Sequence, residues 1–133
     1  MNSLTSLPPL LLVIFGGGLG AGLRYLAGQW AAWQFGNGLP FGTWMVNILG
    51  GLAMGLLVGW LARLEHSPEP LRLLLAVGVL GGFTTFSAFS LEVANMLIRD
   101  ELALAAAYAV SSVVGSVLAL FAGLMIIRTM GSV

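Results

Sequence analysis

The sequence predicts an all-α membrane protein, a single domain with four transmembrane helices. Two observations on composition predict it: 59% of the 133 residues are hydrophobic and only 8% are charged, with a mean hydropathy of +1.01. Ordinary soluble domains carry roughly 25% charged residues, so this chain has too little polar surface to coat a water-soluble globule. The third observation is that the charged residues lie in short groups between apolar stretches, each long enough, at about 18 residues or more, to cross a bilayer.

We predict four spans separated by short loops that carry Gly, Pro or charge. They cover residues 9–33, 41–62, 71–98 and 102–127. Arg24 interrupts the first span and Glu92 lies within the third, whereas the second and fourth contain no charge. Continuous apolar segments favour helices, because the strands of a membrane barrel would alternate apolar and polar residues. No basic residue precedes the first apolar run, which is also too long for a secretion signal, so we expect it to remain in the mature protein.

Charge and cysteine content exclude several kinds of function. The formal net charge is zero and the five basic residues, all Arg, form no cluster that could neutralise a row of phosphates, so no nucleic-acid partner is expected. The chain has no Cys, which excludes disulfides, a thiolate nucleophile and a Cys-based metal site. Because the composition also excludes a soluble enzyme, we expect the protein not to be an enzyme.

The arginines give little preference for either orientation in the membrane. Four spans put Arg63, Arg72 and Arg128 on one side, with Arg99 on the other and Arg24 deeper in the first span. Such a small difference barely biases insertion under the positive-inside rule. A protein of this kind could insert both ways and pair head to tail. Since four short helices leave no room for both a packed core and a hydrated path, a transport role would need at least two copies.

Glycines recur at spacings of four, as in Gly16 and Gly20 and again in Gly51 and Gly55. Small residues at this spacing let helix backbones approach without side chains between them. We therefore expect close helix contacts at these two rows.

Two rows of polar residues lie within the apolar spans. Thr43 and Asn47 are four apart in the second span, and Tyr108, Ser112 and Ser116 repeat that spacing in the fourth. A buried amide or hydroxyl without a partner costs about 1–3 kcal/mol, so aligned polar groups should face each other, water or an ion. For Asn47 alone, a hydrogen bond that joins two helices is as good an explanation as function. Two aligned rows favour a pathway.

The third span contains the segment 81–90, with sequence GGFTTFSAFS, in mid-span. Two adjacent glycines followed by β-branched threonines make poor helix, so we expect the helix to break there. Unwound backbone survives in hydrocarbon only where it is buried in protein or lines a cavity, and its free carbonyls can then coordinate a cation. If the helix resumes, Phe86 and Phe89 share a face. Aromatics at that spacing usually belong to a core, but the positive edge of a phenylalanine ring can also approach an anion.

Three motifs together resemble the Fluc fluoride channels, also called CrcB proteins. They are GGLGAGLRY at 17–25, GTWMVNILG at 42–50 and GGFTTFSAF at 81–89. They stand in the family's order and on its expected helices, and the resemblance covers essentially the whole chain.

The resemblance implies an antiparallel, dual-topology homodimer with two narrow fluoride pores at the subunit interface. In it Phe86 and Phe89 turn their ring edges toward fluoride, Asn47 donates a hydrogen bond to it, and Arg24 attracts anions toward the vestibule. The implied fluoride pathway comprises Thr43, Asn47, Thr85, Phe86, Phe89, Tyr108, Ser112 and Ser116. The resemblance further implies a structural sodium ion held by the backbone carbonyls of Gly81 and Thr84.

The implied function is passive export of cytoplasmic fluoride across the bacterial inner membrane, which gives fluoride resistance. One alternative is a small dual-topology, proton-coupled multidrug transporter. Proton coupling needs a carboxylate deep in a span, where Glu92 is the sole candidate, and we expect Glu92 to have a rim or structural role instead. Another alternative is a non-transporting subunit of a larger membrane complex.

Overall fold

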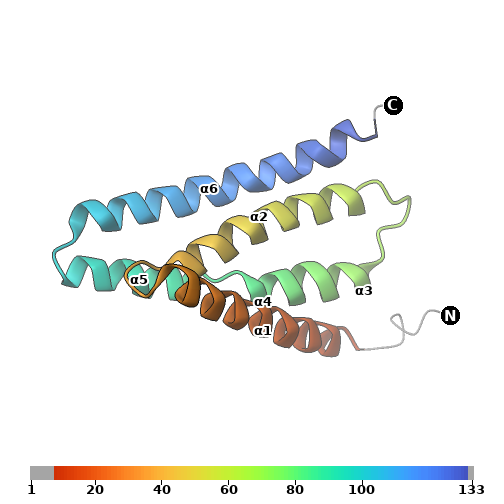
Figure 1. Ribbon diagram of the computed structural model, residues 1–133. Coiled ribbons are helices and arrows are strands. Elements are labelled where there is room, and N and C mark those ends of the chain that lie inside the picture. The colour runs from red at the N-terminus through yellow and green to blue at the C-terminus, as the bar shows by residue number, and fades with distance from the viewer. Residues whose placement is uncertain (1–7, 132–133) are drawn as a thin grey trace.

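The computed structural model describes residues 8–131, which form a bundle of long helices. Residues 1–7, which carry no basic residue ahead of the first span, and residues 132–133 lie outside the described residues. Three of the four spans are single helices: α1 (Pro9–Phe35), α2 (Phe41–Leu61) and α6 (Leu102–Thr129). The third crossing consists of α3 (Glu69–Arg72), the π-helical segment η2 (Leu73–Leu80), α4 (Gly81–Phe83) and α5 (Phe86–Ile98). Within the described residues, four helical segments are long and apolar enough to span a membrane. The all-α prediction with one interrupted span is confirmed (Figure 1).

The ends of the helices follow from Gly and Pro. Gly36, which follows α1, has φ of 75°, a value that glycine adopts without strain, so the helix stops two residues beyond the predicted Trp33. At the third span, Pro70 occupies the first helical turn, where its missing N–H removes no hydrogen bond, and the helix begins at Glu69. The start of α1, the end of α6 and the turn between α2 and α3 lie at the same end of the bundle (Figure 1).

The third span breaks within the segment 81–90, as the sequence predicted. Gly81 and Gly82 are helical, and the helix stops at Thr84 and Thr85, whose ψ angles of 156° and 126° are extended. The break therefore falls on the two threonines of the predicted segment, while the two glycines before them stay helical. Gly82 is needed for packing, because a Cβ there would lie 2.5 Å from the carbonyl oxygen of Gly17 in α1. Thr85 starts the next helix as its N-cap, since its Oγ1 accepts a hydrogen bond from the backbone N–H of Ala88 at 3.2 Å.

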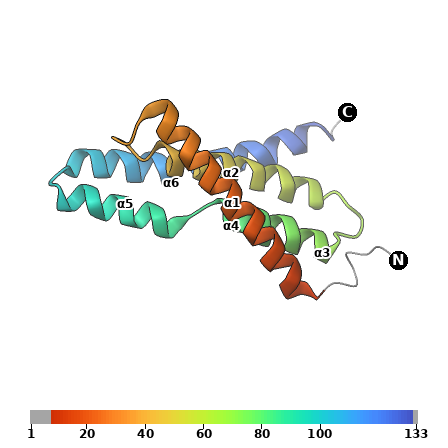
Figure 2. The ribbon, with the colours of Figure 1, turned by 60° about the horizontal axis from the view of Figure 1, so that its bottom comes forward.

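Glycines let the helices pack backbone to backbone. On α1, a Cβ at Gly16 would lie 3.0 Å from the Cα of Gly78, and one at Gly20 would strike the carbonyl oxygen of Val79. On α2, a Cβ at Gly55 would strike a backbone oxygen of α6. Figure 2 shows α1 crossing the middle of the bundle over the interrupted span. The glycine rows therefore fix two contacts, α1 on η2 and α4, and α2 on α6.

The four spans enclose little core of their own. In each span, only 11% to 22% of an 18-residue apolar stretch is buried inside the protein. The main buried cluster joins α5 to α6 and consists of Phe89, Met96, Ala105 and Tyr108. Most of the apolar side chains therefore face outward, toward lipid or a further protein surface.

The glycine contacts lead to a stability prediction. We expect Gly20→Ala to lower the free energy of unfolding by about 1–3 kcal/mol, because the added methyl group meets fixed backbone and forces α1 away from η2. Thermal unfolding in detergent measures the change. Gly22→Ala is the matched control, since a Cβ there meets nothing within 4 Å. Equal melting temperatures for the two variants would contradict the assigned contact.

Candidate functional site

Two side chains from other helices bind the backbone at the break. Asn47 of α2 pairs with both backbone groups of Thr85: its Nδ2 donates to the carbonyl oxygen at 2.9 Å, and its Oδ1 accepts from the N–H at 2.8 Å. Arg24 of α1 donates from Nε to the carbonyl oxygen of Gly82 at 3.1 Å. These bonds replace helical hydrogen bonds that the break removes, in a region where water is not available to do so. The sequence analysis offered a hydrogen bond between two helices as one explanation for Asn47, and the structure contains such a bond.

Other carbonyl oxygens at the break stay free. Across residues 8–131, no hydrogen bond reaches the carbonyl oxygens of Gly81 and Thr84. The hydroxyl of Thr84 turns back to the carbonyl oxygen of Leu80 at 3.0 Å, and the Thr84 methyl group packs where a Cβ of Gly50 would be. Free carbonyl oxygens of this kind are hard ligands, which suit a hard cation.

A groove of about 400 Å³ lies beside the break, between α2, α5 and α6. Its wall is largely apolar and carries a few hydrogen-bonding groups, which come from Asn47, Thr85, Ser112 and Ser116. Ser112 is only 3% exposed, and its hydroxyl is the one buried side-chain polar atom in the described chain that makes no hydrogen bond. The Tyr108 hydroxyl lies close enough to interact with it, and Ser112 also lines the groove, where a bound group could accept a hydrogen bond from it.

Two phenylalanines line the same groove. The helix resumes at Phe86, and the rings of Phe86 and Phe89 lie with their centroids 5.5 Å apart, as the predicted shared face requires. Phe89 is buried and also contacts the ring of Tyr108 at 5.4 Å, whereas Phe86 is 75% exposed. One ring of the pair is therefore fixed in the core of the protomer, and the other is mostly exposed.

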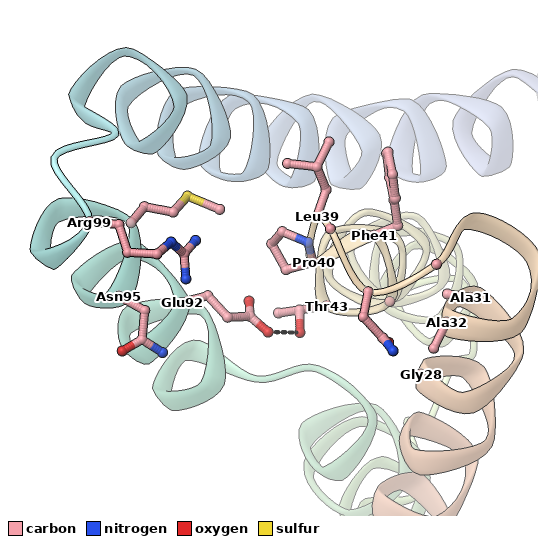
Figure 3. Close-up of a pocket in the computed structure, with 15 residues that line it drawn as sticks. Gly28, Ala31, Ala32, Leu39, Pro40, Phe41, Thr43, Glu92, Asn95 and Arg99 are labelled. Atoms are coloured by element: carbon pink, nitrogen blue, oxygen red, sulfur yellow. Dashed lines mark hydrogen bonds between the residues drawn. The ribbon is translucent and has the colours of Figure 1, made fainter.

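A second hollow, of about 340 Å³, has Glu92 in its wall (Figure 3). The Glu92 carboxylate accepts hydrogen bonds from Thr43 Oγ1 at 2.7 Å and from the Tyr108 hydroxyl at 2.5 Å. Thr43 and Tyr108, which the sequence analysis placed on the fluoride pathway, thus bind Glu92 in this structure and do not line the groove. In Figure 3, Asn95 of α5 and Arg99, which follows the end of α5, lie beyond Glu92, on the side away from Thr43.

Sequence reasoning found Glu92 but not its partners. The signal was present in the spacing: Thr43 precedes Asn47 by four residues, and Tyr108 precedes Ser112 by four. Glu92 follows Phe89 by three, which puts it on the same side of α5. Two of the rows already held Thr43 and Tyr108, so only the Phe86–Phe89 row had to be continued by one helical turn, to Glu92, to relate the three side chains.

A third hollow, of about 380 Å³, shares lining residues with each of the other two. Arg24 lines it together with Thr43, which also belongs to the Glu92 hollow, and Thr85, which also belongs to the groove. The sequence analysis placed Arg24 near a pore mouth; in the structure it lines a hollow and also reaches the break itself.

These features define a class of protein: a four-helix membrane protein with an interrupted span and sparse neutral polar groups along small hollows, an arrangement suited to passing a small ion. The chain belongs to the CrcB family, because the family model described as "CrcB-like protein, Camphor Resistance (CrcB)" matches residues 11–124. This confirms the resemblance found in the sequence. The protein is accordingly a multi-pass membrane protein.

Curated relatives agree with the family. A protein of Caulobacter sp. (strain K31) named "Fluoride-specific ion channel FluC" is 54% identical over 125 residues, which cover 93% of this chain and 98% of the relative. "Fluoride-specific ion channel FluC 2" of Nitrobacter hamburgensis is 50% identical over 118 residues, covering 89% and 95%. A relative from Phenylobacterium zucineum with the first of these names is 56% identical over 120 residues, covering 90% and 94%.

The pairing of Asn47 with Thr85 leads to a second stability prediction. In Asn47→Asp, the new carboxylate still accepts from the Thr85 N–H but faces the Thr85 carbonyl oxygen without a donor. We expect a loss of about 1–3 kcal/mol in unfolding free energy, measured by thermal unfolding in detergent. Ser90→Ala is the control, because its exposed hydroxyl binds only the carbonyl oxygen of Phe86 in its own helix. A melting temperature for Asn47→Asp equal to that of the control would show that the pair does not hold the break.

Proposed function

We propose that this protein is a passive fluoride channel. Membership of the CrcB family and relatives named fluoride-specific ion channels support the proposal. The structural observation that carries it is the buried, unpaired hydroxyl of Ser112 in the same groove as Phe86 and Phe89. A groove of this kind offers hydrogen-bond donors and positive ring edges but no charge.

Neutral donors suit the chemistry of fluoride. The ion is small and strongly hydrated, so a pore must replace its water with several donors yet release the ion at the far side. Ser112, Ser116 and Thr85 supply hydroxyls, and Asn47 has a second N–H beyond the one that binds Thr85. The edges of Phe86 and Phe89 add weak positive potential. The Thr43 and Tyr108 hydroxyls remain part of the proposed pathway, but each must release Glu92 before it can donate to fluoride.

The proposed working unit is an antiparallel homodimer. The groove is open on one side, and Phe86 is largely exposed beside it, so a second copy laid over this face would close the path. The low burial of every span and the weak orientation preference support the same arrangement. Because the relatives are bacterial, we place the dimer in the bacterial inner membrane.

We also propose a structural sodium ion, held by the backbone carbonyls of Gly81 and Thr84 from both subunits. The proposal is supported by the hydrogen bonds at the break. Arg24 and Asn47 bind the carbonyl oxygens of Gly82 and Thr85, whereas the carbonyl oxygens of Gly81 and Thr84 remain available for a cation. A bound cation would supply positive charge that offsets the mutual repulsion of two fluoride ions.

Passive conduction is sufficient for fluoride resistance. Neutral hydrogen fluoride crosses the bilayer and dissociates in a more alkaline cytoplasm, where the anion accumulates. A channel lets the anion leave down its electrochemical gradient, and an inside-negative potential of 100 mV drives each charge outward with about 2.3 kcal/mol.

Purified protein in liposomes tests the function. We expect electrogenic fluoride efflux with little chloride flux, measured with ion-selective electrodes, and a decrease of about tenfold in Phe86→Ile, which removes the aromatic edge. Phe15→Ile, at a similarly exposed phenylalanine on α1, should keep the wild-type rate. Proton-coupled export of organic cations would instead select the multidrug transporter, and a protein that moves neither would be a non-transporting subunit.

Removal of sodium tests the proposed metal site. We expect the melting temperature of the purified protein to fall when sodium is replaced by choline, because binding to the native state alone stabilises it by about 2.7 kcal/mol at a hundredfold excess over Kd. Lithium and potassium serve as controls for general ionic strength. If the melting temperatures in sodium and choline are the same, no structural sodium is present.

A further inference from the structure

We infer that Arg24 is a positioning residue for conduction: its Nε–H holds the broken helix in place, a role separate from any attraction of anions by its charge. The inference rests on the proposed function for its conduction readout. Its basis is the hydrogen bond from Arg24 Nε to the carbonyl oxygen of Gly82 at 3.1 Å.

The contact belongs to a larger seam between α1 and α4. Gly17, Ala21 and Arg24 follow one another at spacings of four and three, so they share a face of α1. A Cβ at Gly82 would lie 2.5 Å from the carbonyl oxygen of Gly17 and 3.1 Å from the backbone nitrogen of Ala21. The end of α4 thus touches the backbone of α1 directly, and Arg24 reaches over from the next turn to bind it.

The position of this bond explains why it is needed. Helical hydrogen bonding ends after Phe83, so the last carbonyl groups before the break have no partner further along the helix. They also form the negative end of the helix dipole, at a depth where water cannot compensate. A guanidinium placed there satisfies one of these oxygens and complements the dipole at the same time.

Arg24 has no competing acidic partner. Among the residues that the structure describes, the ion pairs join Arg72 to Glu69 and Arg99 to Glu101, both away from Arg24. The only hydrogen bond that Arg24 makes there is the one to Gly82. Its side-chain direction is therefore set by the break and not by a counter-ion.

Arg24 and Asn47 act on opposite sides of the break. Arg24 fixes Gly82 from α1, and Asn47 fixes Thr85 from α2, so the two residues between them are held at both ends. One of these is Thr84, which lines the groove next to Phe86. Losing the Arg24 bond frees the α4 end and with it the wall of the groove.

Three substitutions separate the hydrogen bond from the charge. In glutamine, Nε2 follows three side-chain carbons, the same place along the chain as arginine Nε, so Arg24→Gln keeps the donor and removes the charge. Arg24→Lys keeps the charge but has a methylene at that place. Arg24→Met keeps neither.

Fluoride efflux from liposomes is measured over a range of fluoride concentrations at low and high ionic strength, with thermal unfolding in detergent as a second readout. We expect Arg24→Gln to keep a maximum rate within about twofold of the wild type, with a raised half-saturating concentration and less effect of salt. Arg24→Lys and Arg24→Met should each lose about tenfold in maximum rate and melt at lower temperature than Arg24→Gln. Failure of the Lys and Met variants to fold, while the Gln variant folds, supports the same role.

The opposite order overturns the inference. If Arg24→Lys conducts and melts like the wild type while Arg24→Gln does not, the charge alone matters. If all three variants match the wild type in maximum rate and melting temperature, the bond to Gly82 has no role. A wild-type protein without fluoride flux would refute the proposed function instead, and the melting temperatures would still show whether the Nε–H bond holds the break.

Discussion

The structure depends on the pairing of one amide side chain with one peptide unit. A helix that stops in the middle of a bilayer exposes donors and acceptors that no water can reach, and each such group is costly. Asn47 meets a donor and an acceptor of Thr85 together, in the manner of a neighbouring peptide. With that pair in place, Thr85 can begin α5, the two phenylalanines can take their positions, and α2 is joined to the third span. Without Asn47, the backbone N–H and carbonyl group of Thr85 would lose these hydrogen bonds.

The same constraint explains why so few polar groups occur and why most are engaged. Thr43 and Tyr108 converge on the Glu92 carboxylate, and Trp44 donates from its ring nitrogen to Ser111 at 3.1 Å. Against this background the buried Ser112 hydroxyl is an exception. A path for an ion needs groups that are held in place but not fully satisfied by the protein. The groove beside the break combines a fixed frame with donors still available, and it does so without a charged residue in its wall.

The sequence was sufficient for the spans, the interruption and the family, and insufficient for the details of the site. Apolar length located every span because a bilayer requires about 20 residues of helix whatever their neighbours are. The sequence placed the break within 81–90 but could not assign it to the two threonines, since local propensity cannot register that Gly82 is pressed against the backbone of α1. Partners distant in sequence, such as Arg24 with Gly82 or Glu92 with Thr43 and Tyr108, depend on how helices cross. The periodicity of a sequence shows which face of a helix a residue lies on, but not which other helix packs against that face.

The interruption also divides the packing of the molecule. Before it, η2 and α4 lie against α1, while after it α5 joins α6 through the cluster around Met96, and α6 in turn packs along α2. The third crossing therefore packs on α1 before the break and on α6 after it, while α1 and α2 also contact each other directly. In energetic terms, the two parts can loosen as separate cooperative units, so the local opening free energy measured by amide exchange need not be shared along a continuous-looking span. Loosening at the break would first reach the wall of the groove, which Thr84 and Thr85 line.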